Sequence, residues 1–118
     1  MATIHKFTGD STDHKWDQVE AESYAGGATR RVLIGPDDGA GNFALRYFEI
    51  PPNAKSTLDR HEHDHGVYVL KGRGNVHIEG EDHPLLPGDT VYIAPNDEHH
   101  FEAEGHEPFG FLCIIPPK

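Results

Sequence analysis

The chain has 118 residues, which suits one domain with its own hydrophobic core. Twenty acidic residues against ten basic ones give a formal net charge of -10, so we expect no sequence-independent binding to nucleic acid or to anionic membranes. Cys113 is the single cysteine and excludes an internal disulfide bond, and no apolar run reaches the roughly twenty residues that a membrane span requires. Because the first residues lack the apolar stretch of a signal peptide, we expect a cytoplasmic protein.

The chain divides into an arm and a barrel. Residues 1–29 are polar and poorly periodic, and we expect an N-terminal arm that packs on the barrel or on a partner subunit. Residues 30–118 are expected to form a β-barrel, because turn residues are frequent and no segment shows the i, i+3, i+4, i+7 recurrence of a long amphipathic helix. The sequence therefore predicts an all-β domain, with strands over Arg31–Ile34, Phe43–Ile50, Ser56–His61, His65–Leu70, Asn75–Ile78, Thr90–Ile93, His100–Ala103 and Phe109–Ile115.

A histidine-rich run between Asp59 and His65 carries the clearest chemical signal. Imidazole is the commonest protein ligand for transition metals. Alternate side chains of an extended strand point to one face, so the run can present several ligands together, and a second strand can bring His99 against them. The pattern indicates a site for one metal ion, whose candidate ligands are Asp59, His61, His63, His65 and His99.

The spacing of this run resembles the first sequence motif of the cupin family, G-x5-H-x-H-x3,4-E-x6-G. In this chain its positions are occupied by Asn53, Asp59, His61, His65 and Gly72. Asp59 therefore stands where the first histidine is usual, and His65 stands where glutamate is usual.

A second cupin motif, G-x5-P-x-G-x2-H-x3-N, follows after a short spacer. Gly88 and His99 match this motif, whereas Ala94, Asn96 and Ala103 stand where proline, glycine and asparagine are usual. The histidine position of the second motif is thus present.

The resemblance covers roughly residues 30 to 116 and is to small single-domain cupins, in particular the four-histidine manganese-binding bacterial cupins. It implies a double-stranded β-helix, or jelly-roll barrel, with one divalent transition metal per chain (Mn, Fe, Zn, Ni or Co). The implied ligands are Asp59, His61, His65 and His99. In an alternative register, a tight turn brings His63 inward and His63 replaces Asp59.

The resemblance implies a metal-dependent enzyme of dioxygenase, lyase, isomerase or cyclase type that acts on a small molecule inside the barrel. The alternative is a non-catalytic cupin that binds or senses a small ligand or a metal, and the fold alone does not separate the two. No catalytic residue is identified from the sequence. Candidates for proton transfer are Tyr47, Tyr68, Tyr92 and His63.

Small cupins commonly form dimers, so the resemblance leads us to expect a homodimer. The apolar outer positions Tyr68, Leu70 and Tyr92 would suit the contact between the two copies.

Two further residues have alternative interpretations. Arg46 is expected in solvent, unless it shares the inner face of its strand, where it could meet an anionic ligand. Cys113 is expected in the core, with a place beside the metal as the alternative.

Overall fold

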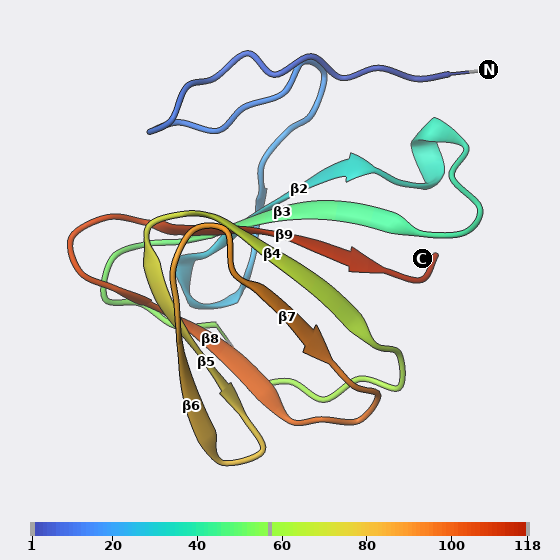
Figure 1. Cartoon of the computed structure of the whole chain (residues 1–118). Coiled ribbons are helices and arrows are strands. Elements are labelled where there is room, and N and C mark those ends of the chain that lie inside the picture. The colour runs from blue at the N-terminus through green and yellow to red at the C-terminus, as the bar shows by residue number, and fades with distance from the viewer. Residues whose placement is uncertain (1, 57, 118) are drawn as a thin grey trace.

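Two antiparallel β-sheets face each other and enclose the core (Figure 1). The computed structural model describes residues 2–56 and 58–117. The larger sheet has the strand order β1-β2-β3-β9-β4-β7, with β1 at Glu22–Ser23, β2 at Thr29–Ile34, β3 at Ala44–Ile50, β9 at Phe109–Ile115, β4 at His65–Lys71 and β7 at Thr90–Ile93. The smaller sheet has the order β6-β5-β8, with β6 at Glu81–Leu85, β5 at Arg73–Ile78 and β8 at His99–Glu104. The prediction of an all-β jelly-roll domain is confirmed.

Helical structure in the described residues is limited to two 3-10 turns, η1 at Ala25–Gly27 and η2 at Pro36–Asp38. No helix in this part of the chain is long and apolar enough to cross a membrane.

The core lies between the sheets and follows the two-residue period of their strands. In β9, Phe109, Phe111, Cys113 and Ile115 are all buried, as strand alternation requires. Burying a large apolar side chain stabilises a fold by about 1.5–3 kcal/mol, so this row holds the larger sheet against the smaller one. The inner row of β3 is Ala44, Arg46, Phe48 and Ile50. An arginine therefore occupies a core position.

Four turn residues of the two motifs have a positive φ angle. Gly72, between β4 and β5, has φ 75°, and Gly88, before β7, has φ 95°. Asn53 and Asn96, which replace motif glycines, have φ 61° and 67°. Asparagine enters this left-handed region more readily than most other non-glycine residues. The two replacements thus preserve the backbone conformation that the motifs require.

The predicted strand Ser56–His61 is wrong for the part of it that the structure describes, which omits Thr57. This segment contacts β8 through hydrogen bonds between Ser56 and Phe101 and an isolated bridge at Asp59, and it forms no continuous ladder in its described residues. Its large apolar residue, Leu58, is 50% exposed, so the segment lacks the apolar face that would hold it in a sheet.

The strand β6 was not predicted. Its sequence, Glu-Asp-His-Pro-Leu, has one buried residue, Leu85, and it contains Pro84. Proline is tolerated here because β6 is the edge strand of the smaller sheet.

The N-terminal segment crosses the outer face of the larger sheet (Figure 1). His14 stacks on Tyr47 of β3 with ring centroids 5.3 Å apart, and Trp16 lies 5.4 Å from the same ring. The Lys71 ammonium donates to the carbonyl of Thr12 at 2.7 Å and pairs with a β3 carboxylate, that of Glu49, at 2.8 Å. Aromatic stacking and a buried cation thus fasten this segment to its own domain.

Candidate metal centre

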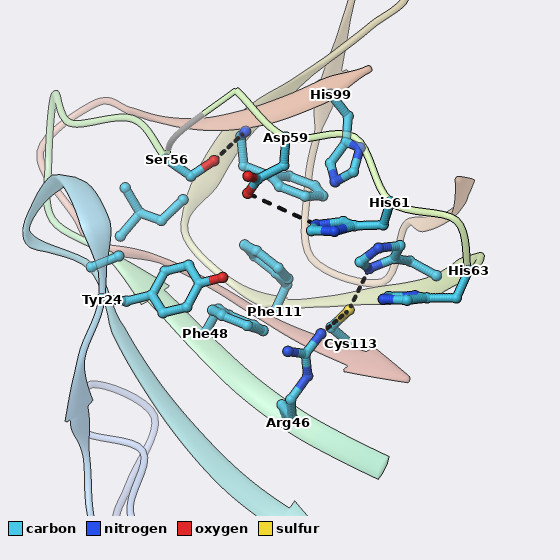
Figure 2. A pocket seen from close by; sticks show the side chains of 14 residues that line it. Tyr24, Arg46, Phe48, Ser56, Asp59, His61, His63, His99, Phe111 and Cys113 are labelled. Carbon is cyan, nitrogen blue, oxygen red and sulfur yellow. Dashed lines mark hydrogen bonds and ion pairs between the residues drawn. The ribbon is translucent and has the colours of Figure 1, made fainter. Parts of the chain in front are cut away.

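Three histidines from two parts of the chain meet between the two sheets. His65 is the first residue of β4, His99 is the first residue of β8, and His61 lies in the segment before β4. Their candidate ligand atoms all lie within 4.8 Å of one another. The ring centroids are 5.1 Å apart for His61 and His65, 5.6 Å for His61 and His99, and 5.1 Å for His65 and His99. The sheets therefore bring together three of the residues that the sequence singled out (Figure 2).

The hydrogen bonds of His65 and His99 involve Nδ1 and leave Nε2 available to a metal. The Nδ1 of His99 lies 2.9 Å from the Asp97 carbonyl, to which it donates, so Nε2 carries the lone pair. The Nδ1 of His65 lies 3.4 Å from Cys113 Sγ, whereas its buried Nε2 has no hydrogen-bond partner among the described residues. Burial, followed by the neighbouring histidines, lowers the pKa of His65 to about 3, so its imidazole is neutral near pH 7.

An unsatisfied buried nitrogen is costly unless a ligand satisfies it, and neutral imidazole is the form that coordinates metal. The orphaned Nε2 of His65, beside two further imidazoles, therefore fits a divalent transition metal.

Asp59 and His63, the two candidates for the fourth position, both line the pocket. The backbone of Asp59 exchanges two hydrogen bonds of 2.8 Å with His99, and its Oδ2 lies 4.0 Å from His61 Nε2. His63 lies in the bend before β4, where its ring stacks on His61 with a centroid distance of 5.1 Å and an interplanar angle of 8°. Both side chains are thus next to the three histidines, and the choice between them stays a prediction.

The pocket above the histidines is narrow and mostly aromatic. The space that the centre of a water molecule can reach measures about 60 Å³. Its walls include Tyr24, Phe48, Phe101 and Phe111. Because one water occupies roughly 10–15 Å³ by this measure, the enclosed part holds about four to six waters or a small molecule of similar size.

Two residues with alternative sequence interpretations lie in this pocket. Arg46 is 6% exposed and Cys113 is 3% exposed, so Arg46 is not the solvated residue that was expected. The reason is strand alternation, which places Arg46 in the inner row with Phe48 and Ile50. Cys113 is a core residue and also contacts His65, and burial raises the pKa of its thiol.

The structure separates the candidates for proton transfer. Tyr47 is on the opposite face of β3 and donates to Glu49 at 3.0 Å, while Tyr68 and Tyr92 are exposed. Among the four candidates, His63 alone lines the pocket. Tyr24, which sequence reasoning missed, also lines it, and its hydroxyl is directed into the space (Figure 2). Its position before β2 in a polar segment gave no signal for this role.

Comparisons with known proteins agree with the motif assignment. The family described as Cupin domain matches residues 46–115, more than half of the chain. A 1-methylthio-D-xylulose 5-phosphate methylsulfurylase from Rhodospirillum rubrum is 38% identical over 111 residues, which cover 88% of this chain and 70% of that protein.

Solved structures show the same fold. A cupin-2 domain protein from Rhodospirillum rubrum superposes with a TM-score of 0.83 at 34% identity, over 95% of this chain and 78% of that chain. A polyketide cyclase from Streptomyces resistomycificus gives a TM-score of 0.79 at 30% identity, over 86% of this chain and 75% of that chain.

Proposed function

We propose that this chain, which belongs to the cupin domain family, is a metal-dependent enzyme that acts on a small molecule in the pocket. The observation that carries the proposal is the convergence of His61, His65 and His99 at an aromatic pocket. There His65 Nε2 has no hydrogen-bond partner among the residues that the structure describes. The similar methylsulfurylase and polyketide cyclase support an enzyme rather than a passive binding module, since both are named for reactions on small molecules.

In this proposal one divalent transition metal (Mn, Fe, Zn, Ni or Co) is held by the three histidines, and Asp59 or His63 completes the site. Such an ion, when bound, supplies a Lewis acid that polarises an oxygen-bearing group, and a redox centre if it is Mn or Fe. Carboxylate and imidazole ligands together suit this group of metals.

The protein side chains supply the remaining chemistry. The rings of Phe48, Phe101 and Phe111 exclude water and strengthen electrostatic interactions within the pocket. His63 and the hydroxyl of Tyr24 are the groups placed to move a proton to or from a bound molecule. Both residues lie outside the β-strands, and the Tyr24 ring packs edge-on against Phe48 with ring centroids 5.4 Å apart.

We further propose a homodimer in the cytoplasm that does not bind nucleic acid. The net charge of -10 supports the last point, because like charges repel the phosphate backbone. A non-catalytic sensing role would leave the metal site intact and would differ only in the absence of turnover.

Metal analysis of protein purified without a histidine tag tests the proposal. We expect one metal per chain, and we expect His61→Ala and His99→Ala to lose it, because each removes a ligand from a set of three or four. His100→Ala is the matched control, since His100 stacks on His77 with a centroid distance of 4.9 Å and does not line the pocket. Full metal content in both ligand variants would contradict the assignment. Turnover is then sought by oxygen-consumption assays of the Mn and Fe forms.

A further inference from the structure

Arg46 is a charged residue in the core that has no counter-ion among the described residues. It is 6% exposed, and its guanidinium is permanently charged near neutral pH. Within residues 2–56 and 58–117, no carboxylate lies within ion-pair distance of it. Its contacts are a hydrogen bond of 3.4 Å from Nη2 to Cys113 Sγ and a cation–π contact with Phe48 at 4.8 Å. The Nε–H group is buried and has no hydrogen-bond partner in the part of the chain that the structure describes.

These contacts do not replace the hydration that Arg46 loses on folding. A thiol is a weak hydrogen-bond acceptor, and a phenyl ring offers only its quadrupole. Buried charges in proteins are normally paired, and arginine is rarely buried without a partner. The position between Ala44 and Phe48 in the inner row of β3 would accept an apolar residue. An arginine at such a position indicates a task in the pocket that it lines.

The pocket also has an excess of positive charge when it is loaded as proposed. Among its described lining residues, Asp59 carries the one carboxylate and Arg46 the one permanent cation. A divalent ion at the histidines adds two positive charges. Arg46 Nη2 and His65 Nδ1 each lie 3.4 Å from Cys113 Sγ, so the guanidinium is one residue away from the metal centre. Figure 2 shows Arg46 and Cys113 side by side in the pocket wall.

We propose that Arg46 is a specificity-determining residue, whose guanidinium binds an anionic oxygen group, a carboxylate or a phosphate, of the small molecule at the metal centre. The inference rests on the proposed function only for the presence of the metal beside Arg46. The binding of an anion by Arg46 can be tested without the metal. Arginine suits this role because its planar fork of N–H donors matches both groups. The chain as a whole carries a charge of -10, so its surface does not attract anions. Binding of a small anion therefore indicates a specific site such as the pocket.

Calorimetric titration with malonate, inorganic phosphate and uncharged malonamide tests this role, on the protein as purified and after treatment with a chelator. We expect malonate or phosphate to bind the wild type at millimolar concentration or tighter, and malonamide to bind more weakly. Arg46→Met and Arg46→Gln should weaken anion binding by at least about tenfold, because a hydrogen bond between charged groups is lost. Whichever anion binds more tightly identifies the carboxylate or the phosphate class.

Arg73→Met is the matched control, because Arg73 is exposed on β5 and does not line this pocket. It should bind anions as the wild type does. The Arg46 variants should keep the wild-type metal content, since Arg46 is not a proposed ligand. Arg46→Met should also melt at a higher temperature in the absence of ligand, because it removes an unpaired buried charge.

Equal anion affinity in the wild type and in whichever Arg46 variant folds would overturn the inference, as would the absence of malonate and phosphate binding to the wild type. If the purified wild type contains no metal, the proposed function is contradicted. The anion affinities of the chelator-treated wild type and Arg46 variants would still decide whether Arg46 binds anions.

Discussion

Asp59 and His63 are alternative candidates for the fourth metal-ligand position beside His61, and substitutions at each residue can distinguish them. Asp59 is fixed by two backbone hydrogen bonds to His99, whereas His63 lies in a bend and is held by ring stacking. Spacing from Gly72 favours Asp59. We therefore expect Asp59→His to bind Zn or Ni at least as tightly as the wild type, because imidazole is the better ligand for these ions.

The same reasoning predicts that His63→Ala keeps its metal, while Asp59→Ala binds metal more weakly. Metal stoichiometry of the two variants at equal total metal is the measurement. If His63→Ala loses the metal and Asp59→Ala keeps it, the motif spacing does not govern the site and His63 is the ligand.

At the scale of elements, the turn at Asn96 connects the two motifs. The backbone N–H of Asn96 donates to the His61 carbonyl at 2.6 Å. The carbonyl of the next residue, Asp97, accepts the hydrogen bond from His99 Nδ1. The turn needs the positive φ of 67°. We expect Asn96→Ala to lower the free energy of unfolding by about 1 kcal/mol, because a left-handed conformation costs most L-residues roughly 1–2 kcal/mol. Asn96→Gly should keep the wild-type free energy of unfolding, because glycine adopts a positive φ without this cost.

Urea unfolding of the metal-free protein gives these free energies, with Asn42→Ala as the control, since Asn42 is exposed and has no positive φ. An equal loss in Asn96→Ala and Asn96→Gly would show that the amide side chain, and not the backbone conformation, stabilises the turn.

Strands could be predicted from the sequence where apolar side chains clearly occupied every second position. The inner row from Phe109 to Ile115 is of this kind. The prediction failed for β6, where Pro84 and charged residues hide an edge strand, and for Ser56–His61, whose alternation reflects pocket lining instead of sheet pairing. Local pattern carries no information on which edge has a partner, because that depends on the closure of the two sheets.

The candidate site was predictable to the same extent. Motif spacing identified the three converging histidines, because His65 and His99 begin strands of fixed register in the two sheets and the bridge between Asp59 and His99 brings His61 beside them. It did not identify Tyr24, which reaches the pocket from the segment before β2. Strand alternation offered the inner position of Arg46 as an alternative, but it did not show that the described residues provide no counter-ion for it. Both depend on contacts between segments far apart in the chain, which no local pattern records.

At the scale of the whole molecule, the outer face of the larger sheet has a covered and an uncovered part. The N-terminal segment covers Tyr47 on β3. Further along the sheet, Tyr92 is 66% exposed and Ile114 is 50% exposed, and both are paired with Gly66, which has no side chain to separate them. Tyr68 lies next to them and is 46% exposed. Contiguous exposed apolar residues of this kind are typical of protein interfaces.

We expect this uncovered part to be the interface of the proposed homodimer, in which two copies bury the same patch against each other. Light scattering at micromolar concentration should give twice the chain mass of 13.1 kDa. Ile114→Glu should give the monomer mass, because it places a charge in a self-complementary contact, where the two carboxylates face an apolar surface. Leu86→Glu is the matched control, as Leu86 is 55% exposed in the turn after β6. A monomeric wild type contradicts the dimer, and an Ile114→Glu variant that stays dimeric places the interface elsewhere.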